Sequence, residues 1–126
     1  MIIDKIRDEK EFYEMFKKYP MDDGIFDYNF LINNNGLYCF YDEEKGFLRG
    51  YINIYRDEEN RLFLSGASIR KNMPDNIQAI IKVCNSYNEN MYADTDKLEA
   101  KICLVKAGFK RLKDYLYVRY IDGQKI

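Results

Sequence analysis

Residues 37–69 alternate in a strand-like pattern rich in aromatic and branched side chains, and two charged turns interrupt this stretch. Short turns join neighbouring antiparallel strands, so the stretch predicts a three-stranded antiparallel meander. Gly50 and Gly66 lie inside the expected strands, where glycine is typical of a bulge or of close backbone approach. The three strands are expected at residues 37–41, 47–56 and 61–69.

The pattern changes to helical spacing after residue 69, following a loop at 70–74. Asp75 and Gln78 are placed as a capping pair for this helix. A short strand at 91–93 follows, and then a second helix that Asp96 and Glu99 are placed to cap. Strand, helix, strand and helix in this order predict a parallel crossover. The apolar residues that predict the buried helix faces are Ile77, Ile80, Ile81 and Cys84 in the first helix, and Leu98, Ile102 and Val105 in the second.

The two ends of the chain complete the expected fold. Ile2, Ile3 and Ile6 predict a first strand, residues 8–19 a helix that Pro20 ends, and residues 21–35 a short helix. Gly108 is placed as a left-handed helix cap, and residues 110–121 predict two strands around Asp114. The sequence therefore predicts one α+β (mixed α/β) domain over residues 1–126, with a central mixed sheet of about seven strands and helices on both faces.

The absence of histidine excludes a Ser-His-Asp triad and a zinc site of the HExxH type. Cys39, Cys84 and Cys103 form no CxxC pair, so we interpret them as small buried apolar residues and expect no metal. The chain lacks an apolar run of about 18 residues and an apolar segment after its first residues, so we expect a cytoplasmic protein without a membrane span. Its high Asn, Ile, Lys and Tyr content is typical of an AT-rich genome, such as that of a low-GC bacterium or its phage.

The net charge of −1 conceals a separation of sign along the chain. Residues 1–60 carry 8 basic and 14 acidic side chains, a charge of −6, whereas residues 61–126 carry 12 and 7, a charge of +5. The basic half is suited to a phosphorylated ligand or an acidic partner. Its lysines are spread along helix faces, where they are ordinarily solvated, so nucleic-acid binding is not expected. The basic residues considered for it are Lys97, Lys101, Lys106, Lys110, Arg111, Lys113 and Arg119.

The order of elements resembles the GNAT superfamily of N-acetyltransferases over nearly the whole chain. The local match is AKICLVKAGF at Ala100 to Phe109, which is similar to the A-x-x-x-x-x-K-x-G-F segment on the last helix of that family. The resemblance implies an N-acyltransferase that uses acetyl-CoA or another acyl-CoA with an amine acceptor. It also implies that acyl-CoA is the small-molecule partner.

In this family, a loop of the pattern Gln/Arg-x-x-Gly-x-Gly/Ala and the amides that open the next helix hold the pyrophosphate of the cofactor. Arg70 matches this pattern, while Met73 and Asp75 stand where the family has small residues and Pro74 removes an amide donor. The cofactor loop is therefore degenerate. The residues that the resemblance places at the cofactor are Ser68, Ile69, Arg70, Lys71, Asn72, Asp75 and Asn76.

The family also has a tyrosine on the last helix that serves as a general acid, and Leu104 occupies that position here. The candidate catalytic residues are therefore Asp94, Tyr92 and Tyr117, of which Asp94 ends the strand expected to be parallel. Two functions stay open. One is a GNAT-like acyltransferase, and the other is a catalytically inactive GNAT-fold binding or structural protein that docks a protein partner through its tyrosine-rich surface.

Overall fold

The computed structural model describes residues 2–5, 10, 36–41, 48–68 and 73–121. Its contacts divide the chain into two compact units, which are described separately: the meander unit (residues 1–55 and 66–71) and the crossover unit (residues 56–65 and 72–126). Backbone hydrogen bonds link the seven strands of the described ranges in the order β1-β2-β3-β4-β5-β7-β6. The predicted mixed sheet is thus confirmed.

The meander unit begins with antiparallel strands, as the alternating pattern predicted. The register changes where Phe40 lies opposite Gly50 and Tyr41 lies opposite Leu48, which makes Arg49 the extra residue of a bulge. The predicted bulge at Gly50 is therefore confirmed. The strands of this unit are β1 (Ile2–Lys5), β2 (Gly36–Tyr41) and most of β3 (Leu48–Arg56), together with the end of β4 (Leu62–Ser68).

Gly66 in β4 is the second glycine that the sequence placed inside a strand. A Cβ atom built at this position would collide with the backbone carbonyl oxygen of Tyr51. Only a residue without a side chain allows the two backbones to approach this closely, so the predicted close approach is also confirmed.

Asn53 lies among the apolar residues of β3. Its side chain is fully buried at 0% exposure, and among the described residues neither its amide nitrogen nor its amide oxygen has a hydrogen-bond partner. A buried polar group without a partner costs about 1–3 kcal/mol relative to its solvated state. The buried apolar residues of this unit are Cys39, Ile52 and Ile54.

We expect Asn53→Leu, which replaces the amide with an apolar side chain of similar size, to raise the free energy of unfolding by about 1–3 kcal/mol. Urea denaturation followed by circular dichroism measures this change. A loss of more than about 1 kcal/mol would contradict the account, because it would mean that the amide has a hydrogen-bond partner in the folded protein.

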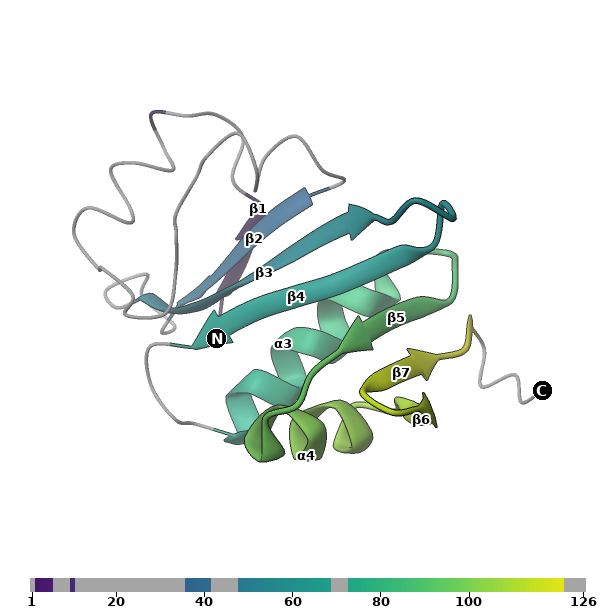
Figure 1. The fold of residues 1–126 in the computed structure, drawn as a ribbon. Coiled ribbons are helices and arrows are strands. Elements are labelled where there is room, and N and C mark those ends of the chain that lie inside the picture. Colours follow the sequence, from purple (N-terminus) through teal and green to yellow (C-terminus); the bar gives the residue numbers. More distant parts are fainter. Residues whose placement is uncertain (1, 6–9, 11–35, 42–47, 69–72, 122–126) are drawn as a thin grey trace. The chain divides into compact units, whose positions relative to one another are not determined.

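The crossover unit contains two helices that pack against each other (Figure 1). Strand β4 pairs in parallel with β5, and β7 pairs antiparallel with both β5 and β6. Asp114 has φ 47° in the turn between β6 and β7, as expected for the tight turn predicted there. The elements of this unit besides the start of β4 are α3 (Met73–Asn85), β5 (Met91–Asp94), α4 (Leu98–Lys106), β6 (Lys110–Lys113) and β7 (Leu116–Arg119).

Arg119 identifies which side chains of β5 and β7 face the helices. Its Nε donates to the carbonyl of Ala107 at 3.1 Å and its Nη2 to Oδ1 of Asn85 at 2.9 Å, so its side chain lies on the helix side. Side chains alternate along a strand and paired residues share a face. Because Arg119 pairs with Met91 and Tyr117 pairs with Ala93, these residues also face the helices.

The predicted buried face of α4 is wrong. Leu98 is 70% exposed and Val105 is 56% exposed, whereas Cys103 and Leu104 are buried and Ala107 follows them inside. The helix is apolar on two sides, so helical spacing alone does not decide which side is covered. The packing of α4 on α3 and on the sheet selects the side of Leu104.

The start and the buried face of α3 also differ from expectation. The helix begins at Met73, so Asp75 lies in its first turn and does not cap it. Its buried residues are Ala79, Val83 and Cys84, while Ile77, Ile80 and Ile81 are half-buried. The small side chain of Ala79 allows close packing of the helix backbone at this point, whereas the larger isoleucines beside it remain partly exposed to solvent.

The cap predicted at the start of α4 is wrong, and the cap predicted at its end is confirmed. Its N-cap is Lys97, which makes no side-chain cap bond, and not the predicted Asp96. At the other end Gly108 has φ 100°, its amide donates to the carbonyl of Val105, and the Phe109 amide donates to that of Leu104 at 2.9 Å. This is a Schellman motif, which confirms the predicted glycine cap. The helix predicted at 21–35 lies outside the described residues, and of the helix predicted at 8–19 only Lys10 is described, in helical conformation.

Candidate active site

Strands β4 and β5 run in parallel but share only two registered pairs, Leu62 with Met91 and Phe63 with Tyr92. Beyond these pairs, β4 continues to Ser68 and β5 to Asp94. The parallel pairing that the sequence predicted is confirmed, and the registered pairing of the two strands ends after Phe63 and Tyr92. Unpaired backbone at the carboxyl ends of parallel strands is a common place for a ligand in mixed sheets.

Helix α3 is the next element of the described chain after β4, and its first turn begins at Met73. The opening amides of a helix have no partner within the helix and attract anions. Of the first three residues, Met73 and Asp75 carry an amide hydrogen and Pro74 does not. Asp75 also adds a carboxylate to this turn, and Asn76 follows it. The first turn of α3 therefore offers fewer donors and more negative charge than a typical phosphate site.

The residues predicted for the cofactor are only partly within the described ranges. Ser68 is the last residue of β4, and Asp75 and Asn76 lie in the first turn of α3. Residues 69–72, which include Ile69, Arg70, Lys71 and Asn72, lie outside the described residues. Their assignment to the cofactor stays a prediction.

Leu104, at the position where the GNAT family has its general acid, is 5% exposed in the core of the crossover unit. Its carbonyl accepts the Phe109 amide of the Schellman motif. The side chain carries no proton to transfer, so any proton donor must come from another element.

The three candidate catalytic residues do not converge. Asp94 ends β5 with an exposed side chain, and Tyr92, two residues earlier, lies on the same face of the strand. Tyr117 pairs with Ala93 and therefore lies on the opposite, helix-covered face, where it is 5% exposed. The structure thus separates Tyr117 from Asp94 and leaves Asp94 at the carboxyl end of the strand.

Tyr92 is held in a stack of side chains at the amino-terminal ends of β4 and β5. Its ring lies 5.7 Å from the ring of Phe63 in a stacked arrangement. The guanidinium of Arg61 lies over both rings, 5.4 Å from the centroid of Phe63 and 5.2 Å from that of Tyr92. These contacts give Tyr92 a packing role, and they place it away from the carboxyl ends of the strands.

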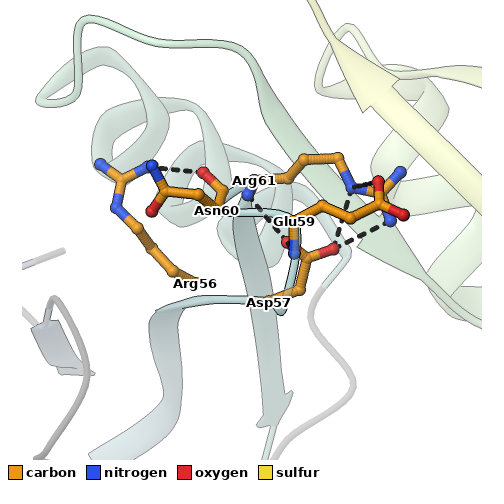
Figure 2. A network of polar contacts seen from close by, with 5 residues as sticks. All are labelled: Arg56, Asp57, Glu59, Asn60 and Arg61. Atoms are coloured by element: carbon orange, nitrogen blue, oxygen red, sulfur yellow. Dashed lines mark hydrogen bonds and ion pairs between the residues drawn. The ribbon is translucent and has the colours of Figure 1, made fainter.

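A network in the turn between β3 and β4 positions Arg61 (Figure 2). Its Nε donates to Oδ2 of Asp57 at 2.9 Å, and its Nη2 lies 2.8 Å from the same oxygen. Glu59 lies on the other side of the guanidinium, with its Oε2 at 3.4 Å from Nε. Asp57 also accepts the backbone amides of Glu59 and Arg61. Desolvation acts to raise the pKa of Asp57, but the hydrogen bonds from Arg61 outweigh it and lower the pKa below its ordinary value.

Arg56 extends this network to the loop after α3. Its two terminal nitrogens contact the carboxylate of Glu89 at 3.1 and 2.6 Å. One of them also donates to the carbonyl of Asn60, as Figure 2 shows. The hydrogen bond from Arg56 lowers the pKa of Glu89. The network was not predicted, because Arg56 and Glu89 lie 33 residues apart and only the fold brings them together.

The cysteines offer no reactive nucleophile. All three are buried, and burial raises the pKa of the Cys84 thiol to about 12, while burial followed by the charge of Glu99 raises the pKa of Cys103. A thiol with so high a pKa is almost entirely protonated at neutral pH and reacts poorly.

We therefore expect Cys84 to remain unmodified by iodoacetamide at pH 8 in the folded protein, and to be modified fully in denaturant. Intact-mass spectrometry followed by peptide mapping measures the modification. Rapid labelling of Cys84 without denaturant would contradict the burial of its side chain on the inner face of α3.

A pocket of about 520 Å³ lies between α4 and the β6–β7 hairpin. Tyr117 was predicted as a candidate catalytic residue, and Lys101 and Arg111 were among the basic residues considered for nucleic-acid binding. The sequence did not indicate that these three side chains line one pocket. The pocket is lined by Lys101, Arg111, Asp114, Tyr115 and Tyr117.

The described part of the chain contains neither a metal-binding cluster nor a helix suited to crossing a membrane. No three side chains of His, Cys, Asp or Glu within it gather where they could hold a metal ion. Neither of its helices combines the length and the apolar character that crossing a membrane requires.

Comparison with solved structures finds a GNAT-family acetyltransferase from Staphylococcus aureus Mu50, known from a crystal structure. The two chains superpose with a TM-score of 0.56 at 16% sequence identity, over 94% of this chain and 99% of the other. No family model and no curated protein matches the sequence. The structural likeness shows that this chain has the GNAT fold, which confirms the resemblance inferred from the order of its elements.

Proposed function

We propose that this protein is an acyl-CoA-dependent N-acyltransferase that transfers an acyl group to an amine. The observation that carries the proposal is the parting of β4 and β5 after two registered pairs, with α3 as the next helix along the chain. The structural likeness to a GNAT-family acetyltransferase supports it. An acyl-CoA, when bound, supplies an activated acyl thioester.

The residues at this end of the sheet fit the two parts of an acyl-CoA unequally. The backbone of β4 just beyond Phe63, which has no registered partner on β5, suits the amide-bearing arm of the cofactor, because extended backbone groups pair with amides. The first turn of α3 suits the phosphates less well, since Pro74 lacks an amide hydrogen and Asp75 carries a negative charge. Arg70 and Lys71 precede this turn in the sequence and provide positive charge for the phosphates.

Asp94 is the proposed general base for the amine. It ends β5, its side chain is exposed, and it lies on the strand that parts from β4. A carboxylate at this position can accept a proton from an incoming ammonium group, directly or through a water molecule. Thr95 follows it, and the Thr95 amide donates to the carbonyl of Tyr115 at 3.0 Å, which fixes the end of the strand to the β6–β7 turn.

The unequal fit predicts that Asp75→Asn tightens binding of CoA. Removing a negative charge from the first turn of a helix changes its interaction with an anion by about 0.3–1 kcal/mol, which corresponds to about a two- to fivefold lower dissociation constant. Calorimetric titration of the full chain with CoA measures the constant. Asp96→Asn, which removes an equal charge outside α3, serves as the control and is expected to leave it unchanged. Weaker binding to Asp75→Asn would contradict the placement of the phosphates at α3.

A further inference from the structure

The pocket between α4 and the β6–β7 hairpin belongs to a different part of the crossover unit from the candidate active site. Lys101 comes from α4, Arg111 from β6, Tyr117 from β7, and Asp114 and Tyr115 from the turn between these strands. None of these residues comes from β4 or α3. The pocket is therefore a second candidate site, with no lining residue in common with the proposed acyl-CoA site.

Its lining is held in place by contacts to backbone and to rings. Nε of Arg111 donates to the carbonyl of Asp114 at 2.9 Å, which fixes the guanidinium beside the turn. Nζ of Lys101 lies 5.5 Å from the centroid of the Tyr115 ring. The Thr95 amide anchors Tyr115 through its carbonyl. These contacts hold both cations in the lining of the pocket.

The charge of the lining favours an anion. Two cations and one carboxylate leave a charge of +1 among the five lining residues. In the part of the chain that the structure describes, the ion pairs involve Arg56 and Arg61, and neither Lys101 nor Arg111 pairs with a carboxylate. The Arg111 side chain uses its Nε toward Asp114, so its terminal nitrogens retain the paired donors that match phosphate oxygens.

The two tyrosines that line the pocket favour a ligand that contains an aromatic ring. Tyr115 is 57% exposed, whereas Tyr117 is 5% exposed and forms the inner wall. An exposed tyrosine beside two cations can stack on an aromatic group while the cations hold an attached anion. We propose that this pocket binds an aromatic monophosphate, with the phosphate between Lys101 and Arg111 and the ring against Tyr115.

The test is a titration of the full-length, isotope-labelled chain with AMP, inorganic phosphate and adenosine, followed residue by residue by heteronuclear NMR. We expect AMP to shift the amide signals of Lys101, Arg111 and Tyr115 saturably, and to bind about tenfold more tightly than inorganic phosphate. Adenosine is expected to bind more weakly than AMP. Residue-resolved signals separate this site from the acyl-CoA site, because shifts at α3 and β4 would report the latter.

Matched variants identify the residues responsible. Lys101→Gln and Arg111→Gln are each expected to weaken AMP binding about tenfold, because each removes a charge-assisted contact. Lys110→Gln removes an equal charge from the same strand as Arg111, outside the pocket, and is expected to leave the affinity within twofold. Thermal melting of all three variants checks that the fold is intact.

Three outcomes would overturn the proposal. They are the absence of saturable shifts at the pocket up to 10-fold molar excess at millimolar protein, an equal loss of affinity in Lys110→Gln, and equal affinities for AMP and inorganic phosphate. Absent shifts would exclude a binding site at the pocket. An equal loss in Lys110→Gln would show only a general attraction between charges, and equal affinities for AMP and phosphate would mean that Tyr115 does not contact the ligand.

Discussion

Phe109→Ala is expected to lower the free energy of unfolding by about 3–5 kcal/mol. The Phe109 side chain is 2% exposed and is among the largest fully buried side chains of the described residues. Its amide closes the Schellman motif on Leu104, and the substitution leaves that hydrogen bond in place. The loss therefore measures the packing of the ring alone. Urea denaturation followed by circular dichroism gives the value.

Leu98→Ala is the matched control on α4. Leu98 is 70% exposed, and surface substitutions usually change stability by less than about 0.5 kcal/mol. A comparable loss in both variants would show that the side of α4 predicted from the sequence is buried after all. A loss below about 1 kcal/mol for Phe109→Ala would contradict the core of the crossover unit as described.

Asp94→Asn is expected to reduce acyl transfer by about a hundred- to ten-thousandfold, because a positioned general base contributes about this much to the rate. Release of free CoA from acetyl-CoA, followed with a thiol reagent on the best amine acceptor from a panel, measures the rate. Binding of CoA is expected to stay unchanged, since Asp94 lies on β5 and the proposed phosphate site lies at α3. A fall in rate with unchanged binding separates a catalytic role from a structural one.

Asp96→Asn serves as the control for this prediction as well. Asp96 is exposed in the short segment between β5 and α4, two residues beyond Asp94. Its loss is expected to leave the rate within about twofold. An equal rate in wild type and Asp94→Asn would contradict the proposed base and leave the acyl-CoA site to be tested separately by binding.

The topology of the described strands could be predicted from the sequence because it depends on local signals. Charged turns separate the meander strands, and a helix between two short strands implies a parallel crossover. Gly108 could be recognised as a cap because a left-handed residue at a helix end favours glycine. Each of these signals is a pattern of consecutive segments along the chain and needs no tertiary contact.

The buried faces of the helices and the second pocket could not be predicted in the same way. Leu98, Ile102 and Val105 have the same helical spacing as the side of α4 that is actually buried, so the period could not distinguish them. The pocket joins α4 to a hairpin tip ten or more residues later, and only tertiary packing places Lys101 beside Tyr115. The separation of Tyr117 from Asp94 likewise follows from strand register, which composition does not reveal.

Calorimetric titration of the full chain with acetyl-CoA, beside a double variant Arg70→Glu with Lys71→Glu, tests whether the protein binds an acyl-CoA. We expect saturable binding of acetyl-CoA to the wild type. The double variant is expected to weaken this binding at least about tenfold, because charge-assisted contacts to phosphate are lost. Lys110→Glu with Lys113→Glu makes the same change in net charge on β6 and is expected to leave the affinity within about threefold. No binding at millimolar acetyl-CoA, or equal weakening by both double variants, would contradict an acyl-CoA site at the parted ends of β4 and β5.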